Sequence, residues 1–278
     1  MDKDKIIKSF SNVKEKEPLI YCITNFVTAS DMAQVIASIG ARPLMANSPK
    51  EAYDIAKVSD CLLINIGTLD DGQKDGVINA YKSALENNVP IIIDPVGIHA
   101  TNYRRNFINE LLNLGSPTLI KGNLSEIKAL LNIESKFKGI DCLEQDSSLS
   151  KDIIEKIDSF SIDKNIIVVV SGKVDLVIFK DKICYVKNGS TLMSKVTGTG
   201  CFLGAILGCF IGSCKDFEYE GFYSAIVGTV FWGICGQEAK SNFKNEDGLF
   251  TYKYTMLDNI SKISITDLIE KGDFYEIL

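Results

Sequence analysis

Short apolar runs rich in Ile and Val recur along the first two thirds of the chain, and segments with helical character separate them. A short continuous apolar run is typical of a strand that is buried on both faces. Strands that alternate with helices predict an α/β fold, in which a mostly parallel central sheet is flanked by helices on both faces. The predicted strands are Leu19–Thr24, Pro43–Ala46, Cys61–Ile66, Pro90–Asp94, Thr118–Lys121 and Ile166–Ser171.

The pattern changes after Ser171. Two apolar segments, 175–180 and 183–187, flank Asp181-Lys182, which predicts a hairpin and therefore antiparallel strands at one end of the sheet. Helices are expected at 200–213, 217–241 and 252–263, and earlier helix starts are indicated by Thr28 with Asp31 and by Ser48-Pro49-Lys50-Glu51. No linker, repeat or low-complexity segment interrupts residues 1–278, so we expect a single domain.

Composition excludes several classes of protein. A content of 46% apolar and 24% charged residues predicts a sizeable core, and a net charge of −6 without a basic stripe disfavours nucleic acid and anionic lipid as partners. The eight cysteines form no CxxC pair and His99 is the only histidine, so no zinc pattern is present. We interpret most cysteines as buried hydrophobes in a reducing compartment. The alternating charges of residues 1–5 lead us to expect no secretory signal. Both features predict a cytoplasmic protein.

A membrane location is the alternative suggested by one segment. Residues 196–214 carry no charge, and Gly200, Gly204, Gly208 and Gly212 have the small-xxx-small spacing of packed transmembrane helices. The turn at 197–200 leaves an apolar helix of only about a dozen residues, which is too short to span a bilayer. A glycine stripe also lets a helix lie close to a sheet, so we expect packing in the core and no membrane partner.

Polar residues follow the predicted strands at their carboxyl ends. In open α/β sheets, ligands bind in the crevice outside these ends. We therefore expect one ligand crevice lined by Thr24-Asn25, Met45-Ala46-Asn47, Asn65-Ile66-Gly67-Thr68, Asp94-Pro95-Val96-Gly97, Lys121-Gly122-Asn123 and Ser171-Gly172.

A glycine-rich turn at 196–200 opens the apolar helix that begins near Cys201. Glycines permit a tight turn, and the free N–H groups at a helix start favour an anion, so a transferred phosphoryl group is a natural occupant beside Cys201. The turn matches neither GxGxxG nor the Walker pattern, and such turns are common before helices. A purely structural turn therefore remains an alternative.

Three charged residues at strand ends each have a functional and a structural interpretation. The carboxylates of Asp94 and Glu126 suit a magnesium-nucleotide complex, because Mg²⁺ takes oxygen ligands. Alternatively, Asp94 caps the turn that follows it, and Glu126 forms a capping box with Asn123. Lys121 closes an apolar strand, where a role as a point charge facing phosphate is easier to explain than a structural one.

The motifs together resemble a known family. Asn123-Leu124-Ser125-Glu126 is similar to the NxxE motif of ribokinase-like kinases, and Gly198-Thr199-Gly200-Cys201 is similar to their anion-hole motif, with cysteine where most members have aspartate. The segments 23–28, 65–69, 94–97 and 121–123 resemble the hydroxyethylthiazole kinase family of thiamin salvage. This resemblance runs from about residue 15 to 262 and implies a ribokinase-like fold.

The resemblance also implies a reaction and its residues. It implies ATP-dependent phosphorylation of the primary alcohol of hydroxyethyl-methyl-thiazole, with Mg²⁺, in a homotrimer whose thiazole sites lie between subunits. By position, the substrate side comprises Asn25, Met45, Gly67, Thr68 and Gly198, the nucleotide side comprises Lys121, Asn123 and Ser171, the metal and phosphate carboxylates are Asp94 and Glu126, and the anion hole comprises Gly198, Thr199, Gly200 and Cys201.

Cys201 occupies the base position of the wider family. Its pKa, ordinarily about 8.5, falls at some helix N-termini, but a neighbouring triphosphate would raise it again. We therefore expect Cys201 to position the substrate hydroxyl and to accept its proton late in the transfer. Phosphoryl transfer depends on positioning and charge stabilisation more than on strong deprotonation.

Some residues depart from the family pattern. Ser171 stands where many relatives have threonine, Ile98-His99 replaces small residues, and 245–250 lacks the Gly-Pro-Gly expected before the last helix. A solvated His99 without a function is the expected reading. The alternatives are a kinase of pyridoxal or hydroxymethylpyrimidine, a nucleotide-dependent dehydratase of damaged nicotinamide cofactors, and a non-catalytic sensor of thiazole or nucleotide. The enzyme alternatives normally have aspartate at position 201.

Overall fold

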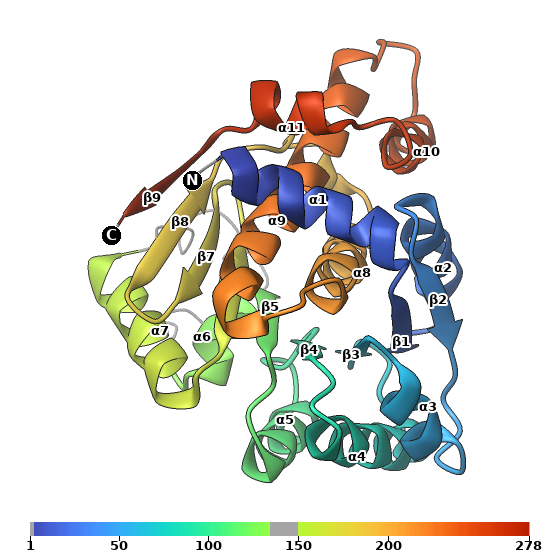
Figure 1. The fold of residues 1–278 in the computed structure, drawn as a ribbon, viewed down its shortest axis with the longest axis vertical. Coiled ribbons are helices and arrows are strands. Elements are labelled where there is room, and N and C mark those ends of the chain that lie inside the picture. Colours follow the sequence, from blue (N-terminus) through green and yellow to red (C-terminus); the bar gives the residue numbers. More distant parts are fainter. Residues whose placement is uncertain (1–2, 134–149, 278) are drawn as a thin grey trace.

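The strands of the described residues form one nine-stranded sheet with the order β2-β1-β3-β4-β5-β6-β7-β8-β9 (Figure 1). The computed structural model describes residues 3–133 and 150–277. The strands are β1 (Leu19–Ile23), β2 (Arg42–Met45), β3 (Cys61–Asn65), β4 (Ile91–Asp94), β5 (Leu119–Asn123), β6 (Ile167–Ser171), β7 (Asp175–Phe179), β8 (Lys182–Val186) and β9 (Phe274–Ile277).

The strands from β2 to β6 pair in parallel, and β7, β8 and β9 are antiparallel to their neighbours. This arrangement confirms the predicted fold class, including the hairpin of β7 and β8. The six predicted parallel strands lie close to their expected bounds. Strand β9 was not predicted, because its four residues alternate between half-buried and exposed and so lack a continuous apolar run.

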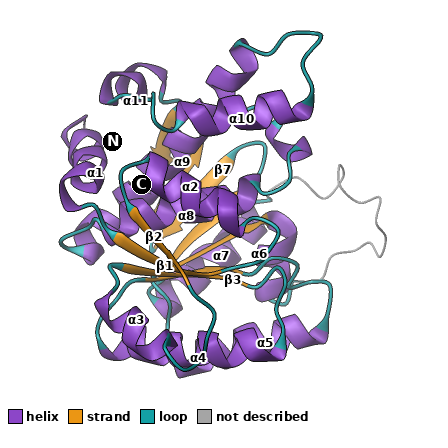
Figure 2. Ribbon diagram, turned by 90° about the vertical axis from the view of Figure 1, so that its right-hand side faces the viewer, coloured by secondary structure: helices purple, strands orange, loops and turns teal. Residues whose placement is uncertain are grey.

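Helices cover both faces of the sheet, so the molecule has three layers (Figure 2). One face is packed by α3 to α7, and the other by α1, α2, α8 and α9, with α10 and α11 beside them. The helices are α1 (Lys3–Lys16), α2 (Ala29–Ser38), α3 (Ala52–Val58), α4 (Asp71–Glu86), α5 (Asn102–Leu114), α6 (Leu124–Leu130), α7 (Lys151–Lys164), α8 (Thr199–Gly212), α9 (Phe217–Ser241), α10 (Leu249–Asn259) and α11 (Ile265–Lys271).

The strand order reverses its direction between β1 and β3. From β1 the chain first adds β2 on one side and then crosses to β3 on the other side. In doubly wound sheets the crevice at such a switch point is where ligands bind, because the connections leave the sheet in opposite directions there. The carboxyl ends of β1 and β3 therefore mark the expected place of the site.

Helix α8 lies directly on β1 and β3 through its glycines. A Cβ atom on Gly208 would lie 3.2 Å from Cγ2 of Ile20, and one on Gly212 would lie 3.1 Å from Cβ of Cys61. The glycine stripe therefore serves close packing on the sheet, as predicted. Among the described helices, none has the length and hydropathy required to cross a bilayer.

Three helices differ in detail from the prediction. Thr28 does precede α2, but its hydroxyl donates to Oδ1 of Asn25 and to Sδ of Met32, and it does not cap the helix. Helix α3 begins at Ala52 and not at Pro49, because residues 48–51 form a turn before it. The last predicted helix, 252–263, is observed as α10, which starts and ends earlier.

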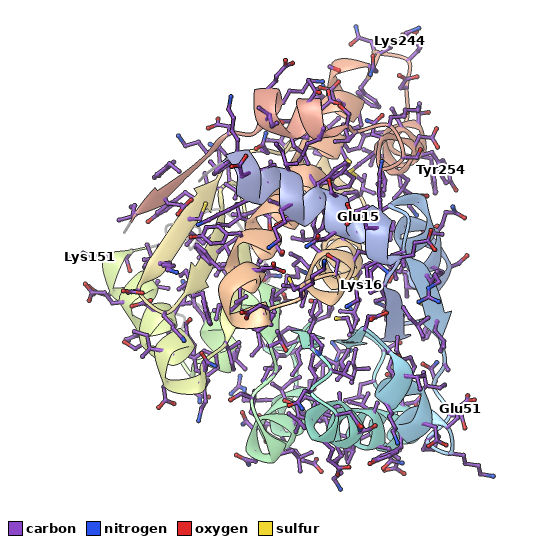
Figure 3. The ribbon with its side chains drawn as sticks, in the orientation of Figure 1. Glu15, Lys16, Glu51, Lys151, Lys244 and Tyr254 are labelled. Atoms are coloured by element: carbon purple, nitrogen blue, oxygen red, sulfur yellow. The ribbon has the colours of Figure 1, made fainter. Side chains whose placement is uncertain are left out.

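Charged side chains lie on the outside of the fold. Glu51, Lys151 and Lys244 project outward from the periphery (Figure 3) and are exposed. In contrast, the buried charged residues of the described chain include Asp94 at the end of β4, Lys121 in β5 and Glu126 in the first turn of α6, which follows β5. This separation directs attention to the carboxyl edge of the sheet.

The glycine packing of α8 leads to a stability prediction. Gly208→Val adds a branched side chain against Ile20 of β1, and overpacking of this kind costs about 1–3 kcal/mol, so the thermal unfolding midpoint is expected to fall. The control is Gly248→Val, because nothing lies within 4 Å of a Cβ atom at that position. Equal midpoints for both variants would contradict the close contact of α8 with the sheet.

Candidate active site

A buried ion pair lies where β4 and β5 meet the start of α8. Nζ of Lys121 is 3.3 Å from Oδ1 of Asp94, and the two residues are 3% and 1% exposed. A Cβ atom on Gly200 would lie 3.1 Å from the same Nζ. Because Gly200 has no side chain, the ammonium group of Lys121 can approach the backbone of the first helical turn.

Both members of this pair have a shifted pKa. Burial raises the pKa of Asp94 to about 6, against the attraction of Lys121. Burial by itself would lower the pKa of Lys121, but the charges of Asp94 and Glu126 outweigh it and the pKa is raised. At neutral pH the lysine is therefore protonated and the aspartate is largely ionised.

The start of α8 has the features of an anion site. Gly198 is the N-cap with a φ angle of +96°, and the first intrahelical bond runs from N–H of Phe202 to its carbonyl. In the described part of the chain, the N–H groups of Thr199, Gly200 and Cys201 have no acceptor. These N–H groups, together with the ammonium group of Lys121, can bind an anionic oxygen.

The residue types at 198 and 199 are explained by local packing. A Cβ atom on Gly198 would lie 2.8 Å from the ring of Phe202 and 2.9 Å from Cγ2 of Thr28, besides requiring an unfavourable φ. The hydroxyl of Thr199 donates to the carbonyls of Met193 and Val196. Thr199 therefore presents only its backbone N–H to a ligand.

Asn65 connects most of the polar groups of the site. Its Nδ2 donates to Oδ2 of Asp94 at 2.8 Å and to Sγ of Cys201 at 3.3 Å. Its Oδ1 accepts from Nδ2 of Asn25 and from N–H of Gly67, each at 3.0 Å. The side chain is 1% exposed, so these bonds replace those it would make with water.

Asn65 was expected in the lining of the ligand crevice but was given no role of its own. Its position at the end of an apolar strand, within 65–68, was the signal that could have identified it. That signal was insufficient, because three of the four partners of Asn65, namely Asn25, Asp94 and Cys201, come from other segments of the chain.

Cys201 accepts hydrogen bonds from two amides. Its half-buried Sγ lies 3.3 Å from Nδ2 of Asn65 and 3.5 Å from Nδ2 of Asn25. Burial, followed by the charge of Asp94, raises the pKa of the Cys201 thiol above its ordinary value, although Lys121 acts in the opposite direction. The position at a helix start therefore does not lower the pKa overall, and Cys201 is a thiol at neutral pH.

Glu126 and Asn123 form the capping box that the spacing suggested. N–H of Asn123 donates to Oε2 of Glu126 at 2.8 Å, and N–H of Glu126 donates to Oδ1 of Asn123 at 2.9 Å. Oε1 of Glu126 accepts from N–H of Gly97 at 3.0 Å. The structural interpretation of this pair is thus correct, and it leaves further lone pairs of the carboxylate for a ligand.

For Asp94 the structural alternative is wrong. The turn after β4 is closed by backbone groups, with N–H of Val96 bonded to the carbonyl of Asp94. The carboxylate itself contacts Asn65 and Lys121 and so faces the site.

The remaining predicted residues lie around this centre. Asn25 and Gly67 each donate a hydrogen bond to Oδ1 of Asn65. Oγ1 of Thr68 accepts from N–H of Phe26 at 3.3 Å. Met45 ends β2 opposite Cys22, and Ser171 ends β6 opposite Asn123, so both lie farther out along the same edge.

The departures from the family pattern lie outside the bonded centre. His99 is exposed, as expected, and a turn at 245–246 precedes α10.

Mg²⁺ is compatible with these residues. In the ranges 3–133 and 150–277, no three His, Cys, Asp or Glu side chains converge into a complete cation cage. Mg²⁺ usually keeps several waters and binds through one or two carboxylates and substrate phosphates, so such a cage is not required. Asp94 and Glu126, buried at the ends of neighbouring segments, fit this manner of binding.

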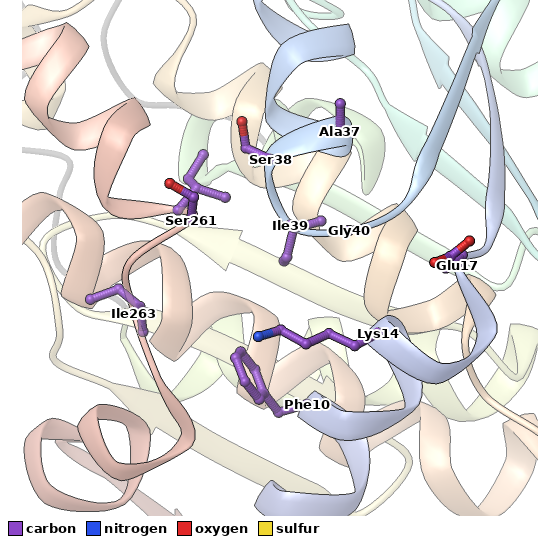
Figure 4. Close-up of a pocket in the computed structure, with 10 residues that line it drawn as sticks. Phe10, Lys14, Glu17, Ala37, Ser38, Ile39, Gly40, Ser261 and Ile263 are labelled. Atoms are coloured by element: carbon purple, nitrogen blue, oxygen red, sulfur yellow. The ribbon is translucent and has the colours of Figure 1, made fainter.

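A surface hollow of about 250 Å³ lies elsewhere on the molecule (Figure 4). Phe10 and Lys14 of α1, Gly40 after α2, and Ile263 after α10 contribute to its lining. Its residues adjoin the turns that lead into β1 and β2, which places it at the opposite edge of the sheet from Asp94. It is therefore separate from the candidate site.

Comparison with known proteins gives consistent matches. The model of the hydroxyethylthiazole kinase family matches residues 10–266. A hydroxyethylthiazole kinase of Clostridium perfringens is 41% identical over 259 residues, which cover 93% of this chain and 97% of that protein. The solved structure of a hydroxyethylthiazole kinase from Pyrococcus horikoshii OT3 has a TM-score of 0.83 at 29% identity and covers 98% of this chain and 99% of the other.

A more distant match concerns the fold alone. A ribokinase-like superfamily protein from Enterococcus faecalis V583 has a TM-score of 0.61 at 10% identity, covering 94% of this chain and 95% of the other. The predicted ribokinase-like architecture is thereby confirmed.

The raised pKa of Cys201 leads to a test of its reactivity. Alkylation by iodoacetamide requires the thiolate, so the rate at Cys201 is expected to rise about tenfold per pH unit, without a plateau, up to about pH 8.5. Peptide mass spectrometry measures the rate, and Cys201→Ser verifies the assignment. The readout is the slope of the alkylation rate against pH. The absolute rate is less informative, because burial of Cys201 also slows the reaction. A plateau below about pH 8 would contradict the raised pKa.

Asn65→Asp provides the matched comparison. It removes an N–H donor to Cys201 and adds a carboxylate beside it, so alkylation is expected to be slower than in the parent at every pH. Asn102→Asp makes the same chemical change at an exposed position and is expected to leave the rate unchanged.

Proposed function

The chain belongs to the hydroxyethylthiazole kinase family, and on that premise we propose that it uses ATP to phosphorylate the primary alcohol of hydroxyethyl-methyl-thiazole in thiamin salvage. The observation that carries the proposal is the approach of the Lys121 ammonium group to the first turn of α8 at Gly200. A cation beside free helical N–H groups is suited to a phosphoryl group in transfer.

The anion hole is assigned to the backbone of residues 198–201. In the loose transition state of phosphoryl transfer, charge lies on the equatorial oxygens of the transferred group. N–H groups of Thr199, Gly200 and Cys201 and the ammonium group of Lys121 would stabilise this charge. Because these groups are already in place, little reorganisation is required during the reaction.

Cys201 is proposed to position the substrate hydroxyl. Its raised pKa means that little thiolate is available at neutral pH to remove a proton early. Early removal is not required, because the alcohol proton becomes acidic as its oxygen bonds to phosphorus, and it would then pass to a phosphate oxygen or to water. Asn25 and Asn65 hold the sulfur in place through their amide groups.

The two sides of the site are assigned from the family resemblance and from position. Asn25, Met45, Gly67, Thr68 and Gly198 form the proposed thiazole side, and Lys121, Asn123 and Ser171 the nucleotide side. The bonded group of Asn25, Asn65 and Gly67 supports the first assignment, and the pairing of Asn123 with Ser171 supports the second.

Asp94 and Glu126 would hold Mg²⁺ with the nucleotide phosphates. The cation supplies charge neutralisation at the phosphates when it is bound. The residues of this chain orient both carboxylates in advance, Asn65 and Lys121 at Asp94, and the N–H groups of Gly97 and Asn123 at Glu126.

We further propose one domain and a cytoplasmic location. A single domain is supported by strands from both ends of the described chain, β1 and β9, which join the same sheet. The location is supported by the seven described cysteines, all free thiols, because disulfides are rare in a reducing compartment.

A coupled assay tests the proposed reaction. ADP formation with ATP and MgCl2 is measured with the thiazole alcohol, pyridoxal or hydroxymethylpyrimidine as acceptor, and turnover is expected with the thiazole alcohol. Exclusive turnover of the pyrimidine would overturn the substrate assignment, and binding without turnover of any acceptor would indicate a sensor. In the same assay, Cys201→Ala with nearly full kcat would refute a role of the thiol in positioning the hydroxyl.

A homotrimer with sites between subunits is proposed as the assembly. Phe26 and Val27, directly after Asn25, are 81% and 60% exposed, and exposed apolar groups beside a site favour contact with another subunit. Light scattering is expected to give the mass of about three chains of 30.6 kDa. Phe26→Asp should lower that mass, whereas Ile162→Asp on the exposed face of α7 should not. A monomeric parent protein would exclude the proposal.

A further inference from the structure

The turn after β4 has a distinctive backbone conformation. N–H of Ile98 bonds to the carbonyl of Pro95 at 3.0 Å, and Gly97 at the third position has a φ angle of +68°. A positive φ at this position is the signature of a type II β-turn. Its central peptide consists of the carbonyl of Val96 and the N–H of Gly97.

This central peptide is bonded at both ends by charged side chains. Nη1 of Arg104, in the first turn of α5, donates to the carbonyl of Val96 at 3.0 Å. N–H of the same peptide, from Gly97, donates to Oε1 of Glu126 at 3.0 Å. The peptide thus lies between a guanidinium and a carboxylate, which polarise it in the same direction and reinforce both bonds.

The two charges select the orientation of the peptide. Type I and type II turns differ in the ψ angle of the second residue and the φ angle of the third, which together rotate the central peptide. A rotated peptide would turn the carbonyl of Val96 away from Arg104 and withdraw the N–H of Gly97 from Glu126. Arg104 and Glu126 therefore stabilise the type II form over the alternative.

Gly97 also makes room for Arg104. A Cβ atom at position 97 would lie 2.2 Å from Nη1 of Arg104. The glycine therefore permits both the positive φ and the close approach of the guanidinium group.

The second nitrogen of the guanidinium group reaches another loop. Nη2 of Arg104 donates to the carbonyl of Gly67 at 2.8 Å, in the segment after β3. Glu126 in turn bonds N–H of Asn123 at the end of β5. Arg104 and Glu126 together therefore connect the ends of β3, β4 and β5, which surround Asp94.

Helix stability does not explain a positive charge at this position. A cation in the first turn of a helix is disfavoured by the helix dipole. Across the described residues, Arg104 forms no ion pair within 4.0 Å, and its bonds go to the two carbonyls. Arg104 therefore stabilises the two loops that it joins, after β3 and after β4.

We infer that Arg104 is a positioning residue for phosphoryl transfer, which holds the Val96–Gly97 peptide toward Glu126 and ties the Gly67 segment to it. This inference rests on the proposed kinase function for its effect on rate, but not for its effect on the turn. The planar fork of arginine suits two carbonyls at once, whereas lysine has a single donor centre.

The first measurement concerns the rate. Arg104→Ala is expected to lower kcat/KM by about 10²-fold, since small misplacements of reacting groups have effects of that size, and to raise the MgCl2 concentration for half-maximal rate. Arg104→Lys should fall between this variant and the parent. Arg105→Ala removes the same charge from the next residue of α5 and should leave both quantities unchanged.

The second measurement concerns the turn in the protein without ligands. Hydrogen exchange of the Gly97 amide, followed by NMR, is expected to be faster in Arg104→Ala than in the parent and unchanged in Arg105→Ala. This readout does not depend on activity, so it still decides the role of Arg104 if the parent proves not to be a thiazole kinase. Should Arg104→Ala fail to fold, Arg104→Lys is measured in its place.

Two outcomes would overturn the inference. One is unchanged exchange of the Gly97 amide in both Arg104 variants. The other is an equal loss of rate in Arg104→Ala and Arg105→Ala, which would indicate a general effect of charge on α5.

Discussion

The buried pair of Asp94 and Lys121 is the interaction on which the candidate site depends. Moving two charges out of water costs several kcal/mol per ion, and mutual attraction offsets this cost only where further hydrogen bonds are made. Asn65 supplies such a bond to Asp94, and the absence of a side chain at Gly200 admits the ammonium group to the first turn of α8. The pair therefore constrains the residue types at two other segments of the chain, at Asn65 and at Gly200.

The packing of α8 on the sheet also serves the buried ion pair. Its glycines bring the helix axis close to β1 and β3, so that its first turn reaches the carboxyl ends of the strands beside Lys121. A bulkier face would lift the helix from the sheet and separate its free N–H groups from the ion pair. Packing of the core and electrostatics of the site thus depend on one set of glycines.

Prediction from sequence succeeded where the signal was local. The buried strands, the capping box of Asn123 and Glu126, and the glycine packing of α8 follow from the spacing of residue types within single segments. It failed where a tertiary partner competed for the same group. Thr28 stands at the position of a helix cap, but its hydroxyl forms hydrogen bonds with Asn25 and Met32 instead.

The sequence by itself determined the α/β class, the strands and the edge at which polar groups gather, because apolar runs and glycines act on their immediate neighbours. The tertiary structure alone decided that the amide of Asn65 joins Asp94, Cys201 and Asn25, and that Arg104 bonds the carbonyls of Gly67 and Val96. Those partners lie on separate segments of the chain, and only the order of the strands and the crossovers between them bring them within hydrogen-bond distance.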